Sequence, residues 1–507
     1  MESERERGRS QGERGRSDRR SSRRDDRLTD AAAADPDGEF VAAADRTATP
    51  REFLWIWHSA QFSLGVVVLG SVPVSFGLGW WGSVTSTLIG LLIGTLVFAP
   101  LARFGMRTGA TDAVSSAAHF GVRGRAITSA ITLCVAIGFF AIAVWTGGTA
   151  VIVAGQRMFG TPAGDGALAA IIPIVAVAVV LVAVFGRQAL LATYKMVTAI
   201  GGIVLLLLVV ALLPGFEPST AGGRLLLGGF WSTWALGVTF GSTVPVTYAT
   251  LQGDYSRHLR PDTADRSAVV WNGAAMFLSN AIVLTIGIMA STMIRESSAP
   301  WVIALTGVVP SWFVAFVVVF GFFGTLPQGA LCIYAAGLAA NSLVRGASRV
   351  SCTLAMAGVG VGVLYIGAIA YDAINSIATF ILFLLALIAP WTAIMLVGFA
   401  QRRGRYAPAE LLGRGRYWFT GGVNFRALTA FLPAVVLGLL LAANPVYTGP
   451  LAGIAAGVDL SCIAPFVVAG TAYYVLCKVF PEREAEVADD RLATADQGRP
   501  HHPAEGI

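Results

Sequence analysis

Charged side chains are scarce in this chain. Only 13% of its 507 residues are charged, whereas 55% are hydrophobic, and the mean hydropathy is +0.68. Soluble domains carry about 25% charged residues. The composition therefore excludes an ordinary soluble domain and indicates an integral membrane protein in contact with the lipid bilayer.

Cysteine is also rare, and the motifs of common enzymes are missing. The five cysteines fall in apolar stretches without CxxC spacing, so we interpret them as packing residues. The sequence has no phosphate-binding glycine loop followed by lysine, no HExxH motif and no nucleophile elbow. We therefore expect no enzymatic activity, no metal centre and no cofactor.

The polar residues are concentrated at the two ends of the chain. Residues 1–50 begin with a run in which arginine alternates with acids, glycine and serine, a composition that cannot bury an apolar face. The interspersed acids weaken its positive field, so we predict a disordered cytoplasmic tail that binds no nucleic acid. Residues 481–507 are predicted to form a second disordered cytoplasmic tail, which leaves 51–480 as the membrane domain.

Twelve segments are long and apolar enough to cross a bilayer, which takes about 20 residues. They lie at roughly 53–77, 80–101, 127–154, 167–185, 193–213, 227–250, 268–293, 311–337, 352–371, 374–400, 425–443 and 459–480. With a cytoplasmic amino terminus, seventeen basic residues fall in inner loops and three in outer loops, at Arg157, Arg224 and Arg295. This bias predicts that both termini are cytoplasmic.

A short pattern occurs in both span one and span six. LGVVVLGSVPV at 64–74 and LGVTFGSTVPV at 236–246 each place a glycine second and a proline tenth in an apolar helix, five spans apart. Transporters built from inverted repeats have discontinuous helices near the bilayer midplane. We therefore predict broken-helix backbone, with ordinary helix packing as the alternative, at Gly65, Gly70, Gly237 and Gly241.

Span one carries two polar side chains three residues apart, His58 and Gln61. This spacing places them on one face of a helix. The amide of Gln61 offers donors and an acceptor that suit a heterocycle with amide groups, and His58 titrates near neutral pH and is a candidate for proton coupling. The alternative for His58 is an interfacial residue with no role in coupling.

Spans three, six and eight supply further polar and aromatic candidates. Phe139 offers a stacking face for a planar ligand, although aromatic rings are also ordinary membrane packing. Thr247 and Tyr248 lie in the second half of span six. In span eight, Thr325 and Gln328 flank a proline, and intramembrane polar groups of this kind are expensive enough to suggest function.

Just beyond span six, Asp254 and Arg257 lie three residues apart. Opposite charges at this spacing attract each other on a helix and stabilise its ends. We expect this pair to cap the helix and to tie the inner gate rather than to contact a substrate.

Motifs spread over nearly the whole membrane region resemble the nucleobase-cation symporter family, which includes the purine-cytosine permeases. In chain order they are WHSAQF in span one, RFGMRTG and HFGVRG after span two, GDYSRHLRP after span six, YAAGL at the end of span eight, APWTAIMLVGFAQRRGRY at span ten and YTGPLAGIAAGVDLS before span twelve. The resemblance implies an all-α integral membrane fold of about twelve transmembrane helices. Its core is a five-plus-five inverted repeat with broken helices one and six, plus two extra helices.

The resemblance also implies how a substrate is held. In the family, aromatic rings of spans three and six enclose the ring of the substrate, and amides hydrogen-bond it. Carried over to this sequence, Phe139 replaces the span-three tryptophan, Ala143 stands where the family has an amide, and Tyr248 replaces a tryptophan. Gln61 corresponds to the span-one asparagine. A flat substrate therefore remains expected, with one hydrogen-bond partner fewer.

The predicted coupling ion is either sodium or a proton. The family binds sodium between span-one carbonyls and a hydroxyl pair in span eight, but here Pro327 and Gln328 occupy the positions of that pair. Thr325 is the nearby hydroxyl, and a cation site with few oxygen ligands binds weakly. Proton coupling through His58 therefore competes with sodium coupling.

We predict a secondary active transporter of the plasma membrane that imports cytosine or a purine by cation symport, as a monomer. The alternatives are a symporter of the same fold for hydantoin, allantoin, a vitamin heterocycle or an amino acid, and, from other classes, a channel or a receptor. The residues predicted to contact substrate are Gln61, Phe139, Thr247, Tyr248 and Gln328, and the cation-coupling candidates are His58 and Thr325.

Overall fold

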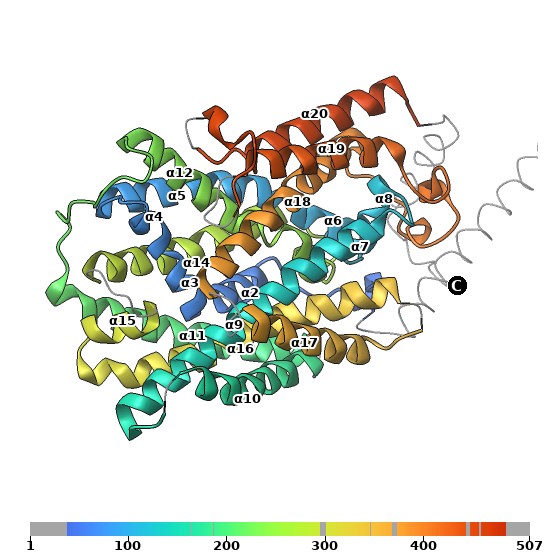
Figure 1. Cartoon of the computed structure of the whole chain (residues 1–507). Coiled ribbons are helices and arrows are strands. Elements are labelled where there is room, and N and C mark those ends of the chain that lie inside the picture. Colours follow the sequence, from blue (N-terminus) through green and yellow to red (C-terminus); the bar gives the residue numbers. More distant parts are fainter. Residues whose placement is uncertain are drawn as a thin grey trace, which may run out of the picture.

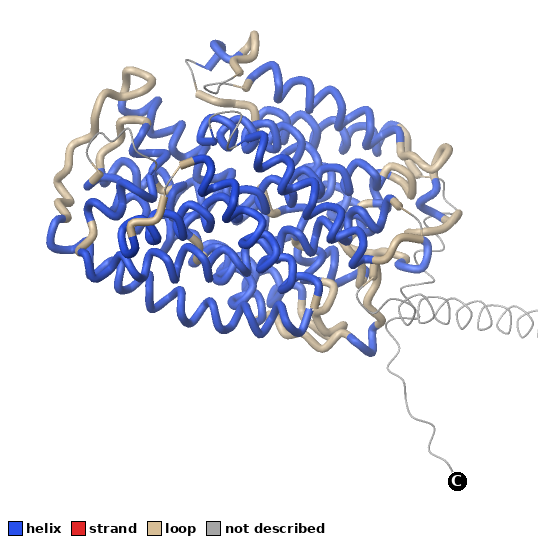
Figure 2. The backbone as a smooth tube through the Cα atoms, turned by 60° about the horizontal axis from the view of Figure 1, so that its bottom comes forward, coloured by secondary structure: helices blue, strands red, loops and turns tan. Residues whose placement is uncertain are grey.

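The computed structural model describes residues 38–162, 164–185, 187–294, 301–344, 346–367, 373–442, 447–455 and 458–482. These residues form helices joined by loops, with isolated β-bridges and no strand (Figure 2). Seven of the described helices are long and apolar enough to cross a membrane, and an eighth span results if one bent helix pair is counted as a single span. The predicted all-α membrane fold is confirmed, whereas the count of twelve spans stays a prediction.

The long helices run side by side across Figure 1, with α6–α8 near one end of the bundle and α4 and α15 near the other. Helix α9 packs along α16, α5 packs along α12, and α18–α20 form a neighbouring group. The helices are α2 (Glu52–Gln61), α3 (Leu64–Leu69), α4 (Ser71–Ser75), α5 (Trp80–Phe98), α6 (Ala102–Thr108), α7 (Asp112–Ser115), α8 (Ala117–Phe120), α9 (Arg125–Phe159), α10 (Asp165–Val184), α11 (Arg187–Leu212), α12 (Phe230–Val246), α13 (Gly253–Ser256), α14 (Asp265–Met293), α15 (Trp301–Val308), α16 (Val314–Leu343), α17 (Arg349–Tyr365), α18 (Ala373–Arg402), α19 (Phe425–Leu441) and α20 (Ile463–Val479).

Span one is broken, as predicted, but not at the predicted glycines. Helices α2 and α3–α4 meet at an angle of 69°, and the break lies at Phe62 and Ser63, whose backbone leaves the helical conformation. Gly65 lies inside α3, and Gly70 is itself helical between α3 and α4. A side chain at Gly70 would meet the backbone of Gly287 at 2.7 Å, so this glycine permits close contact with α14. Gly65 therefore does not form broken backbone, and at Gly70 the chain passes from α3 to α4 with helical dihedral angles.

In span six the helix ends after its glycines rather than breaking at them. Helix α12 continues through Gly237 and Gly241 to Val246, and a short 3-10 turn follows at Ala249–Leu251. A Cβ at Gly237 would lie 2.5 Å from the hydroxyl of Ser86, and one at Gly241 would lie 2.6 Å from a backbone carbonyl of α5. Helix packing, the alternative reading of the repeated pattern, therefore accounts for both glycines.

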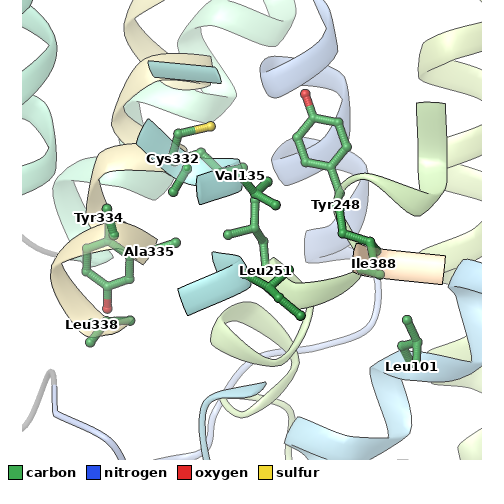
Figure 3. Packing of buried hydrophobic residues seen from close by; sticks show 14 of the residues in the cluster. Leu101, Val135, Tyr248, Leu251, Cys332, Tyr334, Ala335, Leu338 and Ile388 are labelled. Carbon is green, nitrogen blue, oxygen red and sulfur yellow. The ribbon is translucent and has the colours of Figure 1, made fainter. Parts of the chain in front are cut away.

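The turn that follows α12 positions Tyr248 and Leu251 in the core. Figure 3 shows Leu251 close to Val135 of α9, and Tyr248 close to Ile388 of α18. All four side chains are buried. The chain after α12 is thus held by the helices on both sides of it.

Residues 38–49, which the sequence analysis assigned to the amino-terminal tail, pack against the helical bundle. The backbone N–H of Val41 donates to the carbonyl of Gly109 at 2.8 Å, and that of Ala48 donates to the carbonyl of His258 at 3.0 Å. This docked segment joins the loop between α6 and α7 to the loop after α13. The remaining tail residues, 1–37 and 483–507, lie outside the described residues, as does Arg295.

Candidate functional site

A cavity lies where the break in span one and the end of α12 approach α9. We call it the central cavity; its lining residues are Gln61, Val66, Leu69, Phe139, Phe240, Thr243, Val244, Thr247 and Tyr248. The structure therefore brings together four of the five residues predicted to contact substrate. The fifth, Gln328, lies behind this lining, with its amide near the hydroxyl of Tyr248.

Two of the lining rings are stacked on each other. The ring centroids of Phe139 and Tyr248 are 5.4 Å apart, with 26° between the ring planes. A planar ligand held between two rings needs about 7 Å between them, because non-bonded carbon atoms approach to roughly 3.5 Å. The rings must separate to sandwich a heterocycle.

The amide of Gln61 is fully buried at the cavity, with an unused acceptor. Its Nε2 lies 3.9 Å from the sulfur of Met276, and its Oε1 accepts no hydrogen bond from the described residues although the hydroxyl of Tyr248 is nearby. A buried polar atom without a partner costs about 1–3 kcal/mol. A ligand that donates a hydrogen bond to Gln61 would remove this cost.

A second unpaired acceptor belongs to Asn280, whose amide nitrogen contacts the same sulfur of Met276 as that of Gln61. Asn280 of α14 donates to the carbonyl and sulfur of Met276, at 2.9 and 3.1 Å, while its Oδ1 has no partner within the described residues. The sequence analysis missed Asn280. An amide inside span seven was the available signal, since intramembrane polar groups are rarely silent.

The break in span one is joined to α16 by a side-chain hydrogen bond. The hydroxyl of Ser63 donates to Oε1 of Gln328 at 2.6 Å, and both side chains are buried. Thr325 lies one turn earlier, where its hydroxyl donates to the carbonyl of Gly321 at 2.6 Å and lies 3.2 Å from the carbonyl of Ala143. Of the two candidates in span eight, Gln328 therefore meets the break directly, and Thr325 faces α9.

His58 does not line the central cavity. Its Nδ1 is 2.9 Å from the carbonyl of Leu54 in its own helix, and its ring packs edge-on against Phe62. Thr247 does line the cavity, and its hydroxyl donates to the carbonyl of Val244 at 2.8 Å. His58 and Gln61 were predicted to lie on one face of the helix, but of the two only Gln61 lines the central cavity.

We expect the Ser63–Gln328 hydrogen bond to stabilise the protein. Replacing Gln328 by leucine strands a buried hydroxyl, which should lower the free energy of unfolding by about 1–3 kcal/mol. Thermal unfolding in detergent measures the loss. The double variant Ser63→Ala/Gln328→Leu should recover part of it, because both partners are then gone; strictly additive losses would show that the two side chains are not coupled.

A second cavity lies toward the docked segment. This end cavity is lined by residues of the docked segment, α2, α11, α13 with its following loop, and α16: Ala48, Thr49, Glu52, Phe53, Ile56, Leu190, Leu191, Tyr194, Asp254, Tyr255, His258, Leu259 and Tyr334. An aromatic column separates it from the central cavity. Trp57 packs edge-on against Tyr248 of the central cavity at 5.8 Å and against Tyr255 of the end cavity at 6.2 Å.

Hydrogen bonds fix the side chains of Trp57 and Arg257 near the end cavity. Trp57 donates to Oδ1 of Asn272 at 2.8 Å. Arg257, which is fully buried, donates to the hydroxyl of Tyr334 at 3.3 Å and to the carbonyl of Gly38. The two cavities therefore lie on either side of Trp57, whose ring is fixed by the hydrogen bond to Asn272.

The sequence matches the model of one protein family, and the structure resembles solved transporter structures. The family model for permeases for cytosine/purines, uracil, thiamine and allantoin matches residues 40–463. The chain is 24% identical over 452 residues to the putative purine-cytosine permease YxlA of Bacillus subtilis (strain 168), covering 87% of this chain and 95% of that protein.

Two solved structures share the fold. The closed conformation of Mhp1, a nucleobase-cation-symport-1 family transporter with bromovinylhydantoin bound, aligns with a TM-score of 0.71 at 17% identity, over 90% of this chain and 99% of that chain. The substrate-bound outward-open state of a Na+-coupled sialic acid symporter aligns with a TM-score of 0.59 at 11% identity, over 87% and 92% of the two chains. These likenesses support the predicted transporter fold.

Proposed function

Because the chain belongs to the family of permeases for cytosine/purines, uracil, thiamine and allantoin, we propose that it imports a nucleobase or a closely related planar heterocycle by symport with a cation. As a member of this family the chain is a multi-pass membrane transporter and not an enzyme. The observation that carries the choice of substrate is the central cavity, where two stacked rings meet a buried, unpaired amide oxygen. A nucleobase offers the matching chemistry, since it has a flat aromatic face and N–H donors on its edge.

The cavity favours a small heterocycle over an amino acid. Its described lining has no acidic or basic side chain to pair with an amino group or a carboxylate. Gln61 and Thr247 supply the polar groups, and Phe139 and Tyr248 supply the stacking faces. Hydantoin, which Mhp1 binds as its bromovinyl derivative, and allantoin remain the alternatives within the same chemistry.

The remaining features of the proposal concern membrane and coupling. The excess of arginine in the predicted inner loops supports two cytoplasmic termini in the plasma membrane. The coupling ion is sodium or a proton, and the transporter works as a monomer. Gln328 stands where the family has a hydroxyl ligand, and its Oε1 already accepts a hydrogen bond from Ser63. This arrangement weighs against a sodium site at the break in span one.

Uptake into proteoliposomes tests this function. Purified protein should accumulate radiolabelled cytosine under an imposed sodium or proton gradient and not without one, and unlabelled purines, uracil, hydantoin and allantoin should compete according to their fit. If neither cytosine nor any labelled competitor accumulates under either gradient, the assignment to nucleobases is wrong.

We expect Gln61→Leu to weaken substrate binding about 5- to 150-fold, because the loss of a hydrogen bond in a buried site costs about 1–3 kcal/mol. Equilibrium binding of the labelled substrate to the purified variant measures the change. Gln401→Leu, at an exposed glutamine of α18, is the matched control and should bind as the wild type does. If the two variants bind the substrate with equal affinity, Gln61 does not contact the substrate.

A further inference from the structure

Two buried carboxyl groups meet near the end cavity. Asp112 begins α7 and Asp254 lies in α13, and their exposed fractions are 1% and 3%. Oδ2 of Asp112 accepts a hydrogen bond from the N–H of Gly253 at 2.5 Å, and the carboxyl of Asp254 faces the N–H of Asp112. Each carboxyl group thus caps the helix on which the other lies.

The contact between the two helices is close. A Cβ at Gly253 would lie 2.6 Å from Oδ1 of Asp112 and 2.8 Å from its backbone nitrogen, so only glycine fits there. Oδ1 of Asp112 is directed toward α13 and has no hydrogen-bond partner within the described residues. An ionised carboxylate in this position would accept hydrogen bonds from the N–H groups of Gly253 and Gln252, but its charge would still be buried away from water, which is costly.

Positive charge near the pair is limited. Arg257 is the basic group whose charge acts on Asp254, and its guanidinium is also hydrogen-bonded to Tyr334 and Gly38. With both carboxyl groups ionised, the pair carries two negative charges, and Arg257 acts on one of them. One bound proton would balance the other.

The other charged groups of the surrounding helices are engaged elsewhere. Arg107 of α6 pairs with Asp265 at 2.7 Å, and Arg125 of α9 pairs with Glu39 at 3.0 Å. Arg103 of α6 stacks on the ring of Phe399. Arg46 of the docked segment donates to the carbonyls of Val41 and Met106. His119 of α8 contacts the hydroxyl of Tyr406 at 3.1 Å. The titratable groups that share the end cavity with Asp254 are Glu52, Tyr194, Tyr255, His258 and Tyr334.

We propose that Asp112 and Asp254 form a proton-binding site, and that release of its proton toward the end cavity accompanies opening of that cavity. The inference rests on the proposed function, and it names the coupling ion as a proton. While one proton is shared, the α7–α13 contact is neutralised and closed. After its release the two carboxylates repel each other across the Gly253 contact, and α13, which lines the end cavity, moves away from α7.

Burial supports this assignment. It raises the pKa of Asp112 well above its usual range, with the negative charge of Asp254 adding to the effect. Burial also raises the pKa of Asp254 to about 7, against the opposing influence of Arg257. A raised pKa means that the proton is held at acidic and neutral pH and is lost as the pH rises. The closed contact is therefore favoured at low pH.

Infrared difference spectroscopy tests the site without any substrate. Purified wild-type protein in lipid, compared between about pH 5 and about pH 9, should show a protonated-carboxyl C=O band that disappears on alkalinisation. The double variant Asp112→Asn/Asp254→Asn should abolish this band, whereas Asp265→Asn, at a part-exposed aspartate paired with Arg107, should retain it. Thermal unfolding confirms that each variant is folded. An unchanged band in the folded double variant would overturn the proposal.

Transport supplies the second readout. With the labelled compound that the wild type accumulates, Asp112→Asn should still exchange label across the membrane without a gradient but accumulate at least tenfold less under an imposed proton gradient. A pH-sensitive dye inside the vesicles should report proton entry with substrate for the wild type alone. Full proton-driven accumulation by the variant would contradict the inference. If no compound is transported by the wild type, the proposed function fails, and the infrared band still decides the proton site.

Discussion

Replacing Gly94 by leucine should leave almost no folded protein in the membrane. Gly90 and Gly94 lie one turn apart on α5, where a side chain would collide with the carbonyl oxygens of Val238 and Ser242 on α12. Because the colliding atoms belong to the backbone, neither can rotate away, and the two helices would have to separate. Overpacking a core costs about 1–3 kcal/mol even where side chains can adjust, and the total stability of a protein is about 5–15 kcal/mol.

Fluorescence-detected size exclusion of a tagged protein measures this effect as the height of the monodisperse peak. Gly358→Leu is the matched control, because Gly358 is an exposed glycine of α17 with no atom near the position of an added Cβ. A Gly94→Leu peak as high as that of the control would show that α5 and α12 do not depend on this contact.

Tyr248→Ala should weaken substrate binding about 5- to 150-fold, since stacking of a base on an aromatic side chain contributes about 1–3 kcal/mol. The ring is buried, stacks on Phe139 and packs against Trp57, so its removal also opens the column between the two cavities. The substrate bound to this variant should therefore leak toward the end cavity. Equilibrium binding and gradient-driven accumulation measure the two consequences separately.

The hydroxyl and the ring of Tyr248 can be distinguished. Tyr248→Phe keeps the stacking face and should retain most of the affinity. Tyr474→Ala removes an exposed tyrosine of α20 and should change neither binding nor accumulation. A Tyr248→Ala variant with wild-type affinity would mean that the substrate does not stack on this ring.

The sequence predicted a break in span one but placed it wrongly, for a physical reason. Glycine weakens a helix, yet it also lets two helices approach closely, and the sequence alone does not separate the two uses. The break occurs at Phe62 and Ser63, neither of which is a helix breaker. Part of the new conformation is supported by Gln328, 265 residues away in the chain, through its bond to Ser63. A contact between residues so far apart in the chain depends on the fold, so the local sequence around Ser63 does not reveal it.

The candidate site was partly foreseeable. Gln61, Phe139, Thr247 and Tyr248 were chosen as polar or aromatic residues in apolar spans, and the structure places all four around one cavity. Their roles in binding stay predictions. The carboxyl pair was not foreseeable, because Asp112 reads as a surface residue of a loop until the fold brings it against Gly253, 141 residues later.

The docked segment is synthesised before the residues to which it binds, so it can dock only late in synthesis. Residues 38–49 leave the ribosome well before His258 and Arg260, to which Ala48 is hydrogen-bonded. At about 5–20 residues per second, the segment waits roughly 10–40 s for this partner. During that interval the part of the end cavity made by Ala48 and Thr49 does not exist. The amino-terminal half of the bundle is therefore made before this end of it can be sealed, and the seal forms only after span six has been made.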